Sequence, residues 1–160
     1  MRPLRAADET AVLAVHEVMA AEGFEFALGL DACPTWADYL AMLDRLRRGI
    51  EVTDGFVPAT FLVAEVAGEI VGRTSVRHEL NEWLLREGGQ VGYGVLPAHR
   101  GRGHATEILR QSLVVARAAG VDRVLVTCDE DNVASRRVIE ACGGRLDALP
   151  GYRRRRYWIG

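Results

Sequence analysis

The residues of this sequence best suited to chemistry form a short glycine-rich loop, Arg100-Gly101-Arg102-Gly103-His104-Ala105. The loop contains no carboxylate. Gly101 and Gly103 lack a Cβ, so the backbone can turn sharply and direct several N–H groups at one point. A helix is expected to begin directly behind the loop, and its N-terminus adds positive charge. The pattern therefore predicts a binding site for a pyrophosphate group.

Two other phosphate-binding motifs fit this loop poorly. A P-loop requires Gly-Lys-Ser/Thr, and the sequence contains no lysine. A dinucleotide-binding fingerprint requires a third glycine at the position where Thr106 stands. A plain connection from a strand to a helix is also compatible with these glycines, and the loop alone does not remove that alternative.

Length and composition indicate a single soluble globular domain. The chain has 160 residues, of which 49% are apolar and 26% charged, as is ordinary for one globular domain. A net charge of −2 predicts no bulk attraction to nucleic acid or to an anionic membrane. No run of 18 apolar residues occurs, so no transmembrane span is expected. All 20 basic residues are arginine, which excludes Schiff-base chemistry on lysine.

The cysteines argue against a metal site. Cys33, Cys128 and Cys142 are odd in number and lack the spacing of metal ligands. They are typical of buried thiols in a reducing compartment. We therefore expect a cytoplasmic protein without a bound metal.

The elements that must position the loop follow from the hydrophobic periodicity. The pattern predicts helices over 8–21, 36–48, 104–119 and 132–142. It predicts strands over 1–5, 59–66, 69–77, 90–96, 123–128, 145–149 and 152–159. The segment 78–89 is expected to be a loop or a helical turn. The glycine-rich loop thus lies between an apolar strand and a helix.

In this setting, the loop resembles the acetyl-CoA signature of the GNAT superfamily of acyl-CoA N-acyltransferases. That signature runs Gln/Arg-x-x-Gly-x-Gly/Ala, and Arg100, Gly103 and Ala105 stand in register with it. The order of predicted elements also resembles the GNAT fold. The resemblance implies one N-acetyltransferase-like domain over 1–160, with a mixed central sheet of about six to seven strands and helices on both faces. It is strong over 91–144 and weak before 59.

The resemblance also implies a set of contacts to acetyl-CoA as a co-substrate. Backbone N–H groups of the loop would bind the pyrophosphate, and the strand before the loop would pair with the pantetheine arm. Asn132-Val-Ala-Ser135 resembles a family segment whose asparagine touches that arm, although Asn132 can equally be a helix N-cap. The expected cofactor-binding residues are Tyr93, Gly94, Val95, Arg100, Gly101, Arg102, Gly103, His104, Ala105, Thr106, Asn132 and Ser135.

The usual acid of the family is absent from its position. Many members carry a tyrosine seven residues after the asparagine, which protonates the leaving thiolate, and this chain has Ile139 there. Tyr152 and Tyr157 are the candidate substitutes. A CoA thiolate can also leave unassisted, because a thiol has a pKa around 8.5.

The usual base is absent as well. Some members place a glutamate where this chain has Thr127. The stretch Arg-His-Glu-Leu-Asn before the Gly-Gly pair resembles one found in a subset of GNAT proteins, and on that likeness His78 is expected to be the base. Glu82 is the second choice, and Asn81 is expected on the acceptor side. An ordinary polar surface loop is the alternative.

The resemblance implies transfer of an acetyl group from acetyl-CoA to a primary amine of a small molecule or peptide, by direct attack in a ternary complex. The sequence does not identify the amine. Family members often form homodimers, which this sequence permits. The missing tyrosine and carboxylate keep a non-catalytic acyl-CoA-binding or sensing domain as the alternative.

Overall fold

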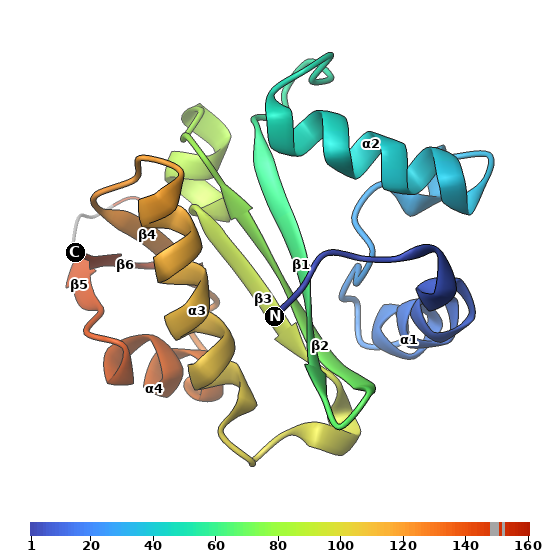
Figure 1. Cartoon of the computed structure of the whole chain (residues 1–160). Coiled ribbons are helices and arrows are strands. Elements are labelled where there is room, and N and C mark those ends of the chain that lie inside the picture. Colours follow the sequence, from blue (N-terminus) through green and yellow to red (C-terminus); the bar gives the residue numbers. More distant parts are fainter. Residues whose placement is uncertain (148–150, 152) are drawn as a thin grey trace.

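The computed structural model describes every residue except 148–150 and 152, and the description below concerns that part of the chain (Figure 1). Six strands form two three-stranded antiparallel sheets with orders β1-β2-β3 and β4-β6-β5. The first sheet consists of β1 (Ala59–Val66), β2 (Glu69–Arg77) and β3 (Val91–Val95). The second consists of β4 (Val124–Cys128), β5 (Arg145–Asp147) and β6 (Arg155–Ile159).

Helices cover both faces of the first sheet, as the sequence predicts (Figure 1). On one face lie α3 (His104–Ala118) and α4 (Val133–Ala141), and on the other lie α1 (Glu9–Ala20) and α2 (Trp36–Arg48) (Figure 1). A single π-helical turn, η3 (Leu84–Gly88), precedes β3. None of the helices in the described part of the chain is long and apolar enough to cross a membrane.

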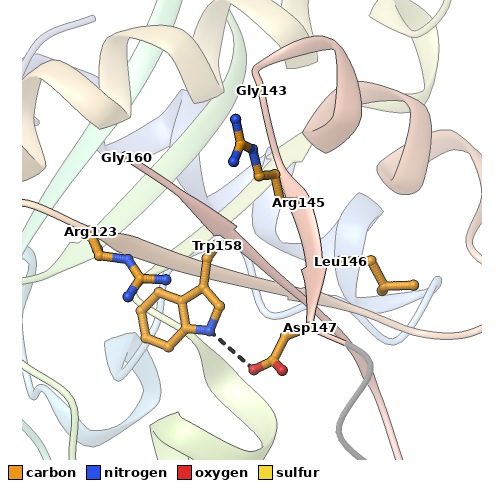
Figure 2. Close-up of a pocket in the computed structure, with 7 residues that line it drawn as sticks. All are labelled: Arg123, Gly143, Arg145, Leu146, Asp147, Trp158 and Gly160. Atoms are coloured by element: carbon orange, nitrogen blue, oxygen red, sulfur yellow. Dashed lines mark hydrogen bonds between the residues drawn. The ribbon is translucent and has the colours of Figure 1, made fainter.

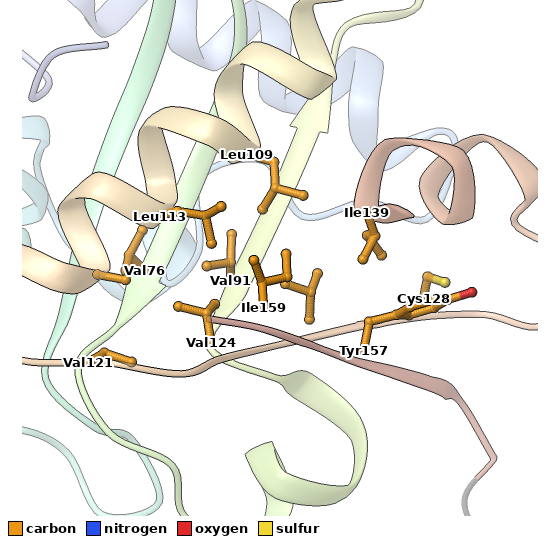
Figure 3. Close-up of a cluster of buried hydrophobic side chains, with 12 residues drawn as sticks. Val76, Val91, Leu109, Leu113, Val121, Val124, Cys128, Ile139, Tyr157 and Ile159 are labelled. Atoms are coloured by element: carbon orange, nitrogen blue, oxygen red, sulfur yellow. The ribbon is translucent and has the colours of Figure 1, made fainter. Parts of the chain in front are cut away.

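Two apolar layers hold this arrangement together. Between α3, α4 and the strands, Leu109, Ile139 and Tyr157 belong to one buried cluster (Figure 3). On the opposite face, Tyr39 of α2 and Phe61 of β1 belong to a second cluster. The alternation of side chains along a strand directs neighbouring residues into different layers.

The two sheets meet at one buried residue. The amide of Gln90 donates to Leu125 O at 2.7 Å, and the amide of Leu125 donates to Gln90 Oε1 at 2.9 Å. Gly89 makes this close approach possible, since a Cβ there would lie 2.7 Å from Leu125 O. Beyond this junction, β3 and β4 share no ladder within the described residues. Their C-terminal ends lead to the glycine-rich loop and to α4 respectively.

The predicted elements are largely confirmed. The helix over 36–48 and the strands over 59–66 and 69–77 have the predicted bounds, and the segment 78–89 contains the turn η3. The strands lie in two sheets instead of one continuous mixed sheet. The strand predicted over 1–5 is wrong: it is reduced to an isolated bridge between Arg2 and Val63, because the chain turns into a 3₁₀ helix at Ala6–Asp8, where Asp8 accepts from the amide of Arg5. The predicted ends of the last two strands at 148–149 and at 152 lie outside the described residues.

Candidate active site

The glycine-rich loop forms an open N-terminus of α3. Gly101 and Gly103 have φ of +74° and +82°, a region that favours glycine. Gly103 is the N-cap and has no side chain to accept from the first-turn amides of α3. Within the described structure, a Cβ at either glycine would meet no heavy atom within 4 Å. The first turn of a 15-residue helix therefore has amide donors available for an anion.

Two charged side chains of the loop differ in their surroundings. Arg102 is exposed beside these amides. The guanidinium of Arg100 instead pairs with Glu22 at 2.5 Å, and its Nε donates to Val95 O at 3.1 Å. This pairing lowers the pKa of Glu22. Arg100 thus fastens the loop to β3 and to the segment that follows α1, and the amides are the loop's free donors.

The remaining residues of the loop contact the neighbouring elements. His104 opens α3, and its ring centroid lies 6.3 Å from that of His99. His99 in turn lies 3.3 Å from Glu69. The carbonyl of Thr106 accepts from the thiol of Cys142 at 3.6 Å, which brings the end of α4 beside the start of α3.

Tyr93 links β3 to the start of α4. Its hydroxyl lies 2.8 Å from Ser135 Oγ, and burial raises the pKa of Tyr93 to about 12. Asn132 Oδ1 accepts from the amide of Ser135 at 2.9 Å, which confirms Asn132 as the N-cap of α4. The structure thus brings together the predicted cofactor-binding residues of the loop, β3 and α4 at one end of the molecule.

The backbone of β3 has a free edge next to this group of residues. Gln90 O and Leu96 N bond to β2, and alternate residues of an antiparallel strand bond to the same neighbour. The N–H and C=O of Tyr93 therefore point away from β2. An extended ligand can pair with such an edge.

His78 lies elsewhere. Its Nε2 is 2.9 Å from Thr60 Oγ1 on β1, and its amide donates to Pro58 O at 2.8 Å. Since β1 pairs with the side of β2 that is remote from β3, this ring does not lie beside the β3 edge. β2, which His78 follows, ends at the end of the first sheet opposite the glycine-rich loop (Figure 1). Burial lowers the pKa of His78.

The neighbouring candidates share that position. Asn81 Nδ2 donates to Gly55 O at 2.9 Å, and its Oδ1 accepts from the amide of Leu84 at 2.9 Å. Both ends of the Asn81 amide group are therefore used to hold η3 and the loop before β1. Glu82 is exposed. The structure does not bring His78, Asn81 or Glu82 together with the predicted cofactor-binding residues.

Glu87 is a carboxylate that the sequence reasoning missed. Thr127, which occupies the position where some family members have their glutamate, donates from Oγ1 to Glu87 O at 2.7 Å. Glu87 Oε2 is shielded from solvent and has no hydrogen-bond partner among the described residues. Its nearest cationic atoms are the Nε atoms of Arg153 and Arg154, at 3.7 and 3.8 Å. No spacing in the sequence marks Glu87, because η3 and Gly89 bring it to β4.

The substitute tyrosines do not join the site in the described structure. Tyr157 is buried in the core, and its hydroxyl donates to Glu140 Oε1 at 3.1 Å. Tyr152 lies outside the described residues. Ile139 is fully buried in the same core (Figure 3).

A surface pocket of about 530 Å³ lies on the second sheet (Figure 2). Arg123 stacks over the ring of Trp158 at 5.0 Å there, and Trp158 Nε1 donates to Asp147 at 3.0 Å. None of the residues that line it is a predicted site residue. No cluster of three or more His, Cys, Asp or Glu suited to a metal occurs in the described part of the chain.

The fold and the site together are those of an α/β domain in which an open helix N-terminus lies next to a free strand edge, an arrangement suited to a phosphate-containing ligand. The family model described as an acetyltransferase (GNAT) domain matches residues 1–145. The chain therefore belongs to the GNAT acetyltransferase family and is an acyltransferase. A search of curated proteins found no match.

Solved structures show the same fold at low sequence identity. An acetyltransferase from Agrobacterium tumefaciens has a TM-score of 0.67 and 20% identity, over 99% of this chain and 88% of that one. A putative acetyltransferase from Salmonella typhimurium, solved with its cofactor acetyl-CoA, has a TM-score of 0.62 and 20% identity, over 98% and 89%. A ribosomal-protein-alanine N-acetyltransferase from Brucella melitensis has a TM-score of 0.63 and 21% identity, over 98% and 95%.

Proposed function

We propose that this protein transfers an acetyl group from acetyl-CoA to a primary amine by direct attack in a ternary complex. The observation that carries the proposal is the open N-terminus of α3 behind Gly101 and Gly103, placed at the end of the free edge of β3. Amide donors there suit a pyrophosphate. The edge at Tyr93 suits the amides of a pantetheine arm.

The surrounding polar groups support this assignment of the acetyl donor. Arg102 and the first turn of α3 supply positive charge without a carboxylate in the loop. Since Asn132 Oδ1 is engaged by the amide of Ser135, we assign the side-chain NH₂ of Asn132 to the pantetheine arm. We assign the stabilisation of the oxyanion of the tetrahedral intermediate to a backbone N–H of the strand from Gly92 to Val95.

We assign the base to Glu87 in preference to His78. A primary ammonium must lose a proton before its nitrogen can attack a thioester, and Glu87 lies against β4, next to the junction with β3. His78 is kept neutral by burial but bonds to β1, on the far side of β2. Asn81 and Glu82 are correspondingly less suited to contact the acceptor than the sequence suggests.

The hydroxyl pair of Tyr93 and Ser135 takes the place of the missing acid. The amine nitrogen forms a bond with the acetyl carbon, the carbon–sulfur bond breaks, and its electron pair stays on sulfur. The thiolate then takes a proton from the pair, which regains it from solvent. Tyr93, with a pKa raised to about 12, holds its proton at neutral pH. The products are an N-acetyl amine and CoA thiol.

Calorimetry with acetyl-CoA, using CoA and ATP as comparators, tests the donor site first. Release of free thiol in the presence of an amine library then tests transfer. We expect micromolar acetyl-CoA binding, none of ATP, and amine-dependent thiol release. Acetyl-CoA binding without thiol release from any amine would favour the sensing domain, and absence of binding would remove the assignment of the loop.

A further inference from the structure

Two arginines of β2 lie on the face of the first sheet opposite α3. Thr74 is on the α3 side, since its Oγ1 accepts from Ser112 of that helix at 2.9 Å. Side chains alternate along a strand, so Arg73 and Arg77 project from the other face. On that face Arg73 lies against Phe24, and Arg77 reaches the backbone of Gly88 and Gly89.

Arg73 is buried and, among the described residues, makes no ion pair with a carboxylate, although the charge of Glu25 acts on it from a longer distance. It is 4% exposed, and its Nη1 and Nη2 donate to two backbone carbonyls, Gly92 O at 3.0 Å and Glu25 O at 2.8 Å. Its Nε has no hydrogen-bond partner in the described structure. The ring of Phe24 covers the guanidinium at 4.4 Å. Burial and the neighbouring charge of Arg77 lower the pKa of Arg73 to about 9.

Within the described residues, the hydrogen bonds of Arg77 go to backbone carbonyls alone. Its Nη1 reaches Gly88 O at 3.5 Å and Gly89 O at 3.4 Å, both long for hydrogen bonds. Among the ion pairs of the described residues, none joins Arg73 or Arg77 to a carboxylate. The carboxylate of Glu25 accepts from the amide of Gly29 at 2.9 Å.

Both guanidiniums converge on the strand where we place acetyl transfer. A Cβ added at Gly92 would lie 3.1 Å from Arg77 Nη1 and 3.7 Å from Arg73 Nη1. Two like charges in a poorly solvated place are costly unless a negative charge joins them. Arginine in such a place binds a carboxylate through two parallel hydrogen bonds.

We infer that the acceptor amine carries a carboxylate, which Arg77 binds while Arg73 reinforces the positive potential behind it. This inference rests on the proposed acetyl transfer and narrows its substrate class to amino-acid-type amines. Arg77 is partly exposed and is the residue that contacts the carboxylate. Arg73 is a positioning residue, because Phe24 and the backbone enclose it. A purely structural pair, which only fastens the segments of Glu25 and Gly88 to the sheet, gives no preference for acidic acceptors.

Matched acceptors separate the two roles. Thiol release is measured with a panel of amino acids, their primary amides, their decarboxylated amines, and phosphate monoesters of amino alcohols. Each is compared in the wild type, Arg77→Gln, Arg77→Lys and the control Arg86→Gln, which removes an exposed arginine from the turn η3 that Arg77 contacts. Calorimetry of the same compounds, with and without CoA, measures binding independently of turnover.

We expect the wild type to prefer the amino acids over the amides. Arg77→Gln should raise KM for the amino acids roughly 10- to 100-fold, the range for loss of a charge-assisted pair of hydrogen bonds. Values for the amides should stay within about twofold in Arg77→Gln, and Arg77→Lys should recover part of the preference. Arg86→Gln should match the wild type.

Equal use of amino acids, amides and decarboxylated amines by the wild type would overturn the inference while leaving acetyl transfer intact. So would a preference for the phosphate monoesters, or an absence of binding by every amino acid. Since the wild-type preference needs no variant, the test stands if Arg77→Gln fails to fold. If the proposed acetyl transfer were wrong, the result would differ: acetyl-CoA would not bind, or no amine would cause thiol release.

Discussion

The hydroxyls of Tyr93 and Ser135 meet at 2.8 Å between β3 and the first turn of α4. They come from segments 42 residues apart in the chain, and neither is the tyrosine that many family members carry, where this protein has a buried isoleucine. In our proposal the acid lies on β3, whereas the tyrosine of other family members would lie on α4. The acid still lies next to the N-terminus of α4. Burial keeps Tyr93 protonated at the pH where a thiolate departs.

Tyr93→Phe should lower kcat by roughly 10-fold, less than the 10²–10⁴-fold typical of a general acid, because a thiolate is already a good leaving group. Binding of acetyl-CoA should stay within about twofold, since the backbone of β3 is unchanged. Steady-state thiol release and calorimetry measure the two effects. Tyr157→Phe is the matched control, as it removes the hydroxyl of a buried tyrosine that bonds to the exposed Glu140. An equal loss of kcat in both variants would contradict the assignment.

The assignment of the base to Glu87 and its assignment to His78 predict different effects of substitution. Glu87→Gln keeps the shape of the side chain and removes its charge, so kcat should fall by about 10²–10⁴-fold. His78→Gln should lower kcat by less than about threefold, because its ring is bonded to Thr60 on β1. Glu82→Gln, an exposed change in the same segment, serves as the control. A large loss in His78→Gln with none in Glu87→Gln would return the base to the residue that the sequence favours.

The element that decides the donor site is the start of α3. Its amides are open because the N-cap is a glycine in the left-handed region, so no side chain occupies the place that an anion would take. Arg100 holds the loop from the outside through Glu22 and the carbonyl of Val95. The loop is therefore positioned by its neighbours before any ligand binds.

Gly103→Glu should abolish measurable acetyl-CoA binding, because it places a carboxylate beside the amides that would bind the pyrophosphate. The same substitution at Gly120, which follows the other end of α3, is the matched control. Both glycines have nearly equal φ, +82° and +84°, and open space around a Cβ. Backbone strain is thus similar in the two variants, and calorimetry isolates the effect of position. Unchanged affinity in Gly103→Glu would mean that the loop is only a turn.

At the scale of the whole molecule, the chain start is fastened to the first sheet by charge. Arg2 pairs with Asp8 at 2.6 Å and with Glu65 of β1 at 2.5 Å. Asp8 Oδ2 also accepts from the amide of Arg5 at 2.7 Å. The hydrogen bond from Arg2 holds the pKa of Asp8 below its usual value. A carboxylate with a lowered folded-state pKa stabilises the fold above its unfolded pKa, near 4, and this stability is lost as the pH falls through the folded value.

Asp8→Asn should lower the free energy of unfolding at pH 7 by roughly 1–3 kcal/mol, the range for a buried hydrogen-bonded charge. The deficit relative to the wild type should shrink below pH 4, where the wild-type carboxylate also becomes protonated. Urea unfolding at several pH values measures both effects. Asp44→Asn, which removes an exposed ion pair on α2, should change stability by less than about 1 kcal/mol. If the difference in the free energy of unfolding stayed constant with pH, the charge of Asp8 would not be what stabilises the fold.

Local patterns in the sequence determined most of the elements and the candidate donor loop. The hydrophobic pattern of a helix or a strand repeats within a short stretch of sequence. The helix over 36–48 and the hairpin of β1 and β2 could therefore be predicted from the sequence. Gly101 and Gly103 are recognisable because only glycine readily adopts their backbone angles. Asn132 is recognisable as a cap because capping involves residues only three positions apart.

The contacts on which the proposed acceptor side and proton donor rest were decided by tertiary structure alone. Glu87 reaches Thr127, Tyr93 reaches Ser135, and Arg73 and Arg77 converge on Gly92 through contacts between segments distant in the chain. No local spacing records such contacts, because they depend on how β3 and β4 part beyond the junction at Gln90. The same geometry directs His78 toward β1. A site formed by residues close together in the chain can therefore be predicted from the sequence. A site formed by residues from both sheets depends on how the two sheets pack.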